Sequence, residues 1–99
     1  MQFEWDPKKA ASNYKKHNVS FSEAATVFDD ARAAIFDDMD HSIVEHRELI
    51  IGTSELARIL IVSFTQRGES TRIISARPVN RKESTKYEKQ YKTSSSPEE

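Results

Sequence analysis

Apolar residues near the start of the chain recur at helical spacing. Asp6-Pro7 supplies an N-cap carboxylate followed by a proline suited to a first helical turn. The apolar positions that follow are Ala10, Ala11 and Tyr14. This pattern predicts a helix from Pro7 to about Lys16, ended by the pair His17-Asn18, because asparagine tolerates the left-handed cap conformation.

A second amphipathic helix is predicted directly after the first. The segment Ser20 to Glu23 has the sequence of a capping box. Four apolar residues then fall on one helical face: Phe21, Ala24, Ala25 and Phe28. Such a face requires a sheet or another helix to cover it, and the rest of the chain offers strands.

The second half of the chain alternates short apolar runs with turn residues. Strands are predicted at 33–36, 45–53, 58–67 and 71–77. Because short turns join the last three, we expect an antiparallel meander within a sheet of three to five strands. Pro78 ends the last strand, and Asn80 with Glu83 repeats the cap pattern, which predicts a polar C-terminal helix from Arg81 to about Tyr91. The fold class is therefore α+β, with two N-terminal helices, an antiparallel meander and a C-terminal helix.

Length and composition limit the chain to few classes of protein. Its 99 residues suit one domain, expected over 1–92, with a disordered tail over 93–99. Cysteine is absent, so disulfides and thiolate chemistry are excluded. No stretch approaches the ~20 apolar residues needed to cross a bilayer, and no export signal begins the sequence. We expect a cytoplasmic protein.

Charge is distributed unevenly along the chain. The net charge is −1, but residues 29–48 carry seven acidic and two basic side chains, whereas 71–92 carry seven basic and two acidic ones. A local basic field therefore exists within a nearly neutral molecule. It could attract phosphates, and it could equally be the solvated face of a helix with i,i+4 charge pairs.

Four arginines fall on or beside the predicted strands: Arg47, Arg67, Arg72 and Arg77. In the central strand, Leu60, Val62 and Phe64 share one face, and Ser63, Thr65 and Arg67 share the other. The second face becomes polar toward Arg67, which predicts an open working surface there. Arg72 and Arg77 are five residues apart, so they share a face only if a bulge or the strand end intervenes. Alternatively, Arg67 only solubilises a hairpin.

Arginine suits a phosphate-binding surface because its planar fork donates two hydrogen bonds and keeps its charge at physiological pH. When the 2′-OH of RNA attacks the adjacent phosphorus, donors aimed at the developing charge contribute ~10²–10³ in rate each, and a metal is not obligatory. His17 is the natural group for proton transfer, although it could simply end a helix. Its rivals as acids, bases or positioning groups are Lys16, Glu45, Glu83 and Tyr87. Arg47, Arg81, Lys82 and Tyr87 are predicted to contact the RNA backbone.

An acidic segment offers a weaker alternative, a divalent metal site. The possible ligands are Asp37, Asp38, Asp40, His41, Glu45 and His46. They lack a fixed ligand spacing, and acidic loops between strands are common as solvated connectors, so we predict neither a metal nor another cofactor. Gly-rich phosphate loops and serine-nucleophile motifs are also absent from the sequence.

Several motifs together resemble one protein family, the BrnT ribonuclease toxins of type II toxin–antitoxin modules, which are related in fold to the RelE group. The matching segments are Phe3-x-Trp5-Asp6, Lys16 to Phe21, Glu45-x-Arg47, Arg72 to Arg77, and Glu83 through Tyr87-Glu88. They occur in the family's order and span nearly the whole chain. The resemblance implies a toxin that cleaves RNA without a metal, with Lys16, His17, Arg67, Arg72 and Arg77 on its active surface. It also implies a DNA-binding antitoxin similar to BrnA, in a hetero-oligomer with the toxin.

The chain departs from the family pattern at two positions. Relatives often have glycine where Asn18 stands, and asparagine can adopt the same backbone conformation. Relatives commonly have Glu-Arg where this chain has Glu83-Ser84, so one cation of the last helix is missing. Weakened or absent activity is therefore an alternative. So are a non-catalytic nucleic-acid-binding protein and a RelE-fold toxin that acts on a protein.

Overall fold

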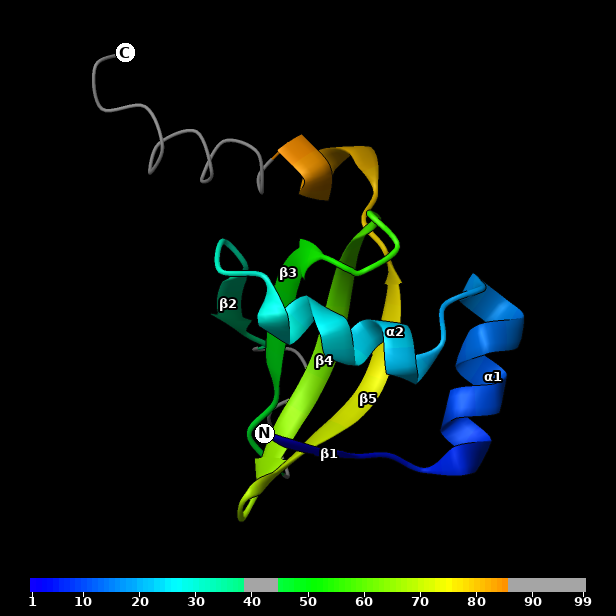
Figure 1. The fold of residues 1–99 in the computed structure, drawn as a ribbon, viewed down its shortest axis with the longest axis vertical. Helices are drawn as coiled ribbons and strands as arrows, with labels where there is room; N and C mark the ends of the chain where they lie inside the picture. Colours follow the sequence, from blue (N-terminus) through cyan, green and yellow to red (C-terminus); the bar gives the residue numbers. More distant parts are fainter. Residues whose placement is uncertain (39–44, 86–99) are drawn as a thin grey trace.

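A five-stranded mixed sheet forms the centre of the molecule in the computed structural model, which describes residues 1–38 and 45–85 (Figure 1). Its strand order is β1-β5-β4-β3-β2. In chain order the elements are β1 (Gln2–Glu4), α1 (Pro7–His17), α2 (Phe21–Thr26), the 3-10 helix η1 (Val27–Asp29), β2 (Ala34–Asp37), β3 (Glu48–Thr53), β4 (Ile59–Arg67), β5 (Ser70–Pro78) and a C-terminal helix described over 81–85. The α+β class is thereby confirmed.

The predicted antiparallel meander of three strands is correct and β2 extends it to four, whereas the prediction of a wholly antiparallel sheet is wrong. Strands β2 to β5 pair antiparallel in sequence order. Strand β1 instead pairs parallel with β5, with Phe3 opposite Thr71. A three-residue strand has too little alternation to reveal its partner. The parallel pairing is possible because α1, α2 and the meander supply the long connection that parallel strands need. The relationship to the RelE group stays a prediction.

The two N-terminal helices begin and end largely where the sequence predicts. The Asp6 carboxylate accepts a hydrogen bond from the Lys8 backbone N–H at 2.9 Å, and Asn18 adopts a left-handed conformation with φ of 59°. The second helix is shorter than predicted, because its last turn tightens into η1. Its capping box is half formed: Ser20 Oγ accepts from the Glu23 N–H at 3.0 Å, while the Glu23 carboxylate is used by Arg58 and Ser54.

The main core lies between α2 and one face of the sheet, which α2 crosses in Figure 1. The largest side chains buried there include Phe21, Leu60 and Ile73. Ring contacts tie β1 and η1 to the sheet, since Phe28 lies 5.1 Å from Phe3 and 5.0 Å from Phe64 between ring centroids. A second, smaller apolar cluster around Ile51 and Ile61 lies on the opposite face. Ile61 of this cluster also lines a cavity on that face.

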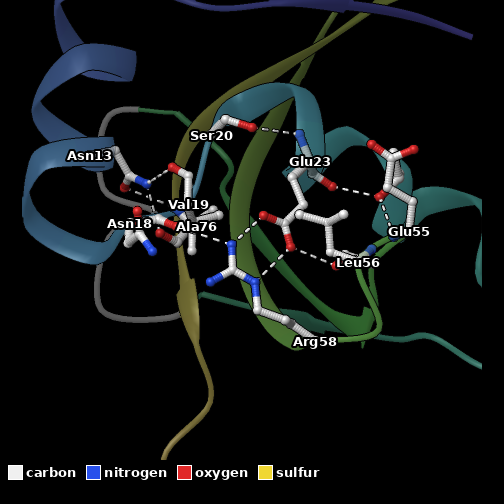
Figure 2. Close-up of polar contacts among 11 residues, drawn as sticks. Asn13, Asn18, Val19, Ser20, Glu23, Glu55, Leu56, Arg58 and Ala76 are labelled. Carbon is white, nitrogen blue, oxygen red and sulfur yellow. Dashed lines mark hydrogen bonds and ion pairs between the residues drawn. The ribbon is translucent and has the colours of Figure 1, made fainter.

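Buried Asn13 closes the edge of β5 beyond its short pairing with β1. Its amide N–H₂ donates to the carbonyls of Ala76 (2.8 Å) and Val19 (3.0 Å), and its oxygen accepts from the Ala76 N–H at 3.0 Å (Figure 2). An asparagine can do this because its side chain carries the same donor and acceptor as a peptide group. It therefore stands in for a neighbouring strand and holds α1 against β5.

Asn13→Ala is expected to destabilise the protein by about 1–3 kcal/mol, because buried backbone groups of Ala76 and Val19 lose their partners. Urea unfolding followed by circular dichroism measures the change. Ser12→Ala, on the exposed part of the same helix, is the matched control and should change stability by less than about 0.5 kcal/mol. Equal stability of the Asn13 and Ser12 variants would show that water replaces the amide without loss.

The remaining boundaries shift by a few residues. Strand β3 begins at Glu48, so Arg47 lies just before the strand instead of within it. The C-terminal capping box is complete, with Asn80 Oδ1 accepting from the Glu83 N–H at 2.8 Å and Asn80 N–H donating to Glu83 Oε1 at 3.0 Å. The predicted remainder of that helix and the predicted disordered tail over 93–99 lie outside the described residues. Within the described ranges, no helix is long and apolar enough to cross a membrane.

Candidate nucleic-acid interface

A bulge in β5 brings two of the predicted arginines to one face of the sheet. Ser63 pairs with Ser75 and Phe64 with Ile73, so Ile74 is an extra residue on β5. Arg77 lies opposite Ile61, and Arg72 lies opposite Thr65. Ile61 and Thr65 share a face of β4, the one turned away from the main core. The irregularity that the sequence required is therefore present, and Arg72 and Arg77 share the open face.

A cavity of about 330 Å³ opens on this face around Arg77. It is lined by Asp38, Arg47, Leu49, Ile61, Ser63, Ile74, Ser75, Arg77 and Glu83. The Arg77 guanidinium donates to both Glu83 oxygens, from Nη1 at 2.8 Å and from Nη2 at 2.7 Å. This fork-to-fork pair fixes the plane of the guanidinium at the mouth of the cavity, with 39% of the Arg77 side chain still exposed.

A second cavity, of about 200 Å³, lies on the α1 side of β5. Lys16 and His17 from the last turn of α1 line it together with Ser75 and Ile74. The same two β5 residues line the first cavity, so the cavities meet along β5. The structure thus brings two of the predicted acid–base candidates, Lys16 and His17, to one side of Ser75 and Arg77 to the other. Lys9 adds a further cation to this wall.

A third group of charges joins the loop before β3 to the β4–β5 hairpin. Glu45 lies between two arginines, 3.5 Å from Arg47 Nε and 3.4 Å from Arg67 Nη2. Arg47 also lines the cavity that contains Arg77. Arg67 lies at the far end of β4, opposite Ser70. The predicted arginines therefore converge to different degrees. Arg47 and Arg77 line one cavity, whereas Arg67 is joined to Arg47 through Glu45.

Arg72 lies nearer to the β4–β5 hairpin than Arg77 does, and it pairs with a different carboxylate. Its Nη1 donates to Glu4 of β1 at 3.0 Å. Five residues of strand separate it from Arg77, about 16 Å along the chain direction at ~3.3 Å per residue. Arg72 consequently belongs to the same face but not to the same cavity. The sequence missed Glu4 as its partner because β1 itself was not predicted to pair there.

The structure describes some of the remaining predicted site residues and not others. Arg81 and Lys82 are exposed in the first turn of the C-terminal helix, close in sequence to the Glu83 that pairs with Arg77. Tyr87, Asp40 and His41 lie outside the described residues. Ser75 and Ile74, which line both cavities, were missed because a serine and an isoleucine in a strand carry no chemical signal in the sequence.

The acidic segment does bring three possible metal ligands together. Ligand atoms of Asp37, His46 and Glu48 all lie within 4.8 Å of one another, and His46 Nε2 is 3.3 Å from Asp37 Oδ1. Asp37 and Glu48 are cross-strand partners, which explains their proximity. This group differs from the predicted one, because Glu45 turns to the arginines while Glu48 joins the cluster.

Arginine partners lower the pKa of Glu83 and Glu23. Hydrogen bonds from Arg77 lower the pKa of Glu83 from its usual value, against the opposing effect of burial. Hydrogen bonds from Arg58 likewise lower the pKa of buried Glu23. Glu83 is therefore held ionised at neutral pH, and its role is more readily that of a partner for Arg77 than of a proton donor.

Comparison with known proteins places these features in a family. A family model described as the ribonuclease toxin, BrnT, of type II toxin–antitoxin systems matches residues 5–83. The 1.1 Å crystal structure of the Brucella abortus ribonuclease toxin, BrnT, is 25% identical in sequence with a TM-score of 0.64, over 82% of this chain and 99% of that one. A search of curated proteins found no match. This chain therefore belongs to the BrnT family of ribonuclease toxins of type II toxin–antitoxin systems.

Proposed function

We propose that this protein is an endoribonuclease toxin that cleaves RNA without a metal ion. The observation that carries the proposal is the junction of the two cavities at Ser75, with Arg77 and Arg47 on one side and Lys16 and His17 on the other. A phosphate that lies across β5 at this point meets a guanidinium from one wall and an ammonium or imidazole from the other. Family membership supports the same reaction class.

The proposed chemistry is attack of a ribose 2′-oxygen on the adjacent phosphorus. The new P–O2′ bond forms as the P–O5′ bond breaks, which leaves a 2′,3′-cyclic phosphate and a 5′-hydroxyl. Arg77 stabilises the charge that develops on the phosphate oxygens. His17 transfers the proton between the 2′-oxygen and the leaving 5′-oxygen, directly or by way of water, and Lys16 contributes positive charge. Arg67, Arg72, Arg81 and Lys82 hold the RNA on either side.

Four of the arginines proposed to bind RNA already form ion pairs with carboxylates of the protein. The pairs are Arg77 with Glu83, Arg72 with Glu4, and both Arg47 and Arg67 with Glu45. A phosphate can approach the remaining N–H groups of each guanidinium, since a fork carries five donors and a carboxylate takes at most two of them. The carboxylates therefore orient the arginines in advance, at the cost of weaker net attraction for RNA.

Cleavage of messenger RNA is expected to persist in EDTA and to yield fragments with 5′-hydroxyl ends, because the proposed site uses only protein side chains. Incubation of the purified protein with RNA, followed by 5′-end labelling by polynucleotide kinase without prior phosphatase treatment, tests both points. Activity that appears only when Mg²⁺ is added would instead favour the group of Asp37, His46 and Glu48.

A non-catalytic RNA-binding role is the second candidate, favoured by the ion pairs of Arg47, Arg67, Arg72 and Arg77 and by Ser84 in place of the family's usual arginine. A backbone binder leaves RNA intact and loses affinity with salt at a log–log slope of about −0.7 per neutralised phosphate on single strands. Intact RNA after incubation with folded protein, combined with such a slope, would replace the catalytic proposal by this one.

We further propose an antitoxin partner similar to BrnA, in a hetero-oligomer that covers the basic face. The family's place in type II toxin–antitoxin systems supports a partner of this kind, and an acidic or amphipathic segment would complement Arg77 and Arg47. A small DNA-binding reading frame next to the gene, whose product copurifies with this protein, is the expected finding.

A further inference from the structure

The helix α1 concentrates positive charge beside β5 at the edge of the molecule (Figure 1). It contains four lysines and no acidic residue over Pro7–His17. A carboxylate three or four residues away would offset such a cation on a helix surface, but this helix contains none. All four lysines are exposed, and they are Lys8, Lys9, Lys15 and Lys16.

The lysines of α1 differ from the arginines of the sheet in their ion pairing. Arg72 pairs with Glu4, and Arg77 pairs with Glu83. Among the residues that the structure describes, no ion pair involves a lysine of α1. These ammonium groups therefore keep their full attraction for an external anion, whereas carboxylates offset part of the attraction of the arginines.

Two of the four lysines line the cavity of about 200 Å³ between α1 and β5. Lys9, Ser12 and Lys16 follow one another at spacings of three and four residues, which places them on one face of the helix. Lys8 and Lys15 do not line this cavity. The cavity therefore has two ammonium groups and a hydroxyl along one wall.

The helix dipole favours Lys16 but not Lys9. Lys16 lies in the last turn of α1, where the negative end of the dipole attracts a cation. Lys9 lies in the first turn, where the dipole opposes a cation. The charge of Lys9 therefore brings no stability to the helix and is better explained by a ligand in the cavity.

The cavity also has the length to follow an RNA strand away from Ser75, where it meets the cavity of Arg77. Lys9 precedes Lys16 by seven residues, which corresponds to about 10.5 Å along the helix at ~1.5 Å per residue. The two ammonium groups can therefore contact different phosphates of one strand. Proteins commonly follow a single-stranded backbone with a positively charged groove of this kind.

We propose that Lys9 and Ser12 form a subsite for a backbone phosphate of single-stranded RNA, away from the phosphate at Ser75. The Lys9 ammonium supplies charge, and the Ser12 hydroxyl donates a hydrogen bond to a phosphate oxygen. The proposal rests on the proposed function, because it states the path of the strand beyond the cleavage point. Both groups contact the backbone alone, so the subsite accepts any base.

The test measures binding of RNA that cannot be cleaved. Fluorescence anisotropy with the full chain follows a 2′-O-methylated uridine nonamer over a series of salt concentrations. Lys9→Gln should weaken binding at low salt by about threefold to tenfold and make the log–log salt slope shallower by about 0.7, the loss of one phosphate contact. Lys9→Arg keeps the charge and should keep the native slope. Ser12→Ala removes a neutral donor, so it should weaken binding by about threefold with the slope unchanged.

Removal of any positive charge could weaken binding at long range, so a matched control is required. Lys8→Gln removes the same charge from an exposed residue in the same turn that does not line the cavity. It should leave the salt slope within about 0.2 of the native value. Thermal unfolding checks that each variant is folded before binding is compared.

The outcomes separate this proposal from the proposed function. An unchanged slope in Lys9→Gln, or an equal change in Lys8→Gln, overturns the subsite and leaves the proposed function in place. Failure of the native protein to bind the nonamer at low salt overturns both. Unchanged RNA binding by Lys9→Gln with loss of a copurifying antitoxin overturns the subsite and assigns this face of α1 to the protein partner. A shallower slope in Lys9→Gln alone supports the proposal.

Discussion

Arg77→Ala is expected to lower the rate of RNA cleavage by about 10²–10³, the effect of removing one donor aimed at transition-state charge. The structure makes Arg77 the arginine best held for this task, because Glu83 fixes its plane at the mouth of the cavity shared with Arg47. Cleavage rates on a defined messenger RNA, measured under single-turnover conditions, give the fold change. Arg77→Lys should recover only part of the rate, because an ammonium keeps the charge but lacks the fork.

Arg32→Ala is the matched control, since Arg32 is exposed before β2 and lines neither cavity of the candidate interface. It should leave the cleavage rate within about twofold of the native value. The Arg77 variants must first be shown to be folded, because Glu83 loses its partner when the guanidinium is removed. Normal cleavage by folded Arg77→Ala would show that the site is wrongly assigned.

Arg58→Ala is expected to lower the free energy of unfolding by about 2–3 kcal/mol. Arg58 donates from Nε to Glu23 at 2.9 Å and from Nη2 to the Asn18 carbonyl at 3.0 Å, and it forms an ion pair with the same carboxylate (Figure 2). The Glu23 side chain is only 4% exposed, so loss of Arg58 leaves a buried charge with less compensation. A fully buried pair would cost ~3–5 kcal/mol when broken, but 33% of the Arg58 side chain is exposed.

Urea unfolding at neutral pH measures this loss of stability, and Arg32→Ala again serves as the control for removal of an exposed arginine.

The pH dependence of the stability difference gives a second check. Because the pKa of Glu23 is lowered in the folded state, its contribution to stability is complete above the ordinary value of 4.5 and disappears as the pH falls through the folded pKa. The difference between native protein and Arg58→Ala should therefore shrink below about pH 4.5. A constant difference across this range would mean that Arg58 acts through packing alone.

This network matters for function because it holds the end of α1. Arg58 bonds to Asn18, the residue that ends α1, and Glu23 belongs to the first turn of α2. His17 and Lys16 immediately precede Asn18 and face the second cavity. The position of the proposed acid–base groups thus depends on contacts made by a loop between β3 and β4, far away in sequence.

Helix caps, apolar alternation and short turns in the sequence predicted most of the secondary structure. Asp6-Pro7, Ser20 and the pair of Asn80 with Glu83 begin helices, because each supplies an oxygen to orphan N–H groups. Alternation and short turns located the four strands of the meander to within a few residues. The exception is β1, which has only three residues and pairs with β5, a strand far away in sequence.

The candidate site likewise has features that the sequence predicts and features that only tertiary packing sets. The sequence by itself determined that three arginines lie on β4 and β5, that a cap residue follows Lys16 and His17, and that Arg72 and Arg77 require an irregularity to share a face. Only the tertiary structure decided that Ile74 is the bulged residue, that Glu83 and Glu45 orient the arginines, and that Ser75 lies between the two cavities. The physical reason is range: caps and alternation depend on neighbouring residues, whereas strand register and ion pairing depend on contacts that form only when distant segments pack together.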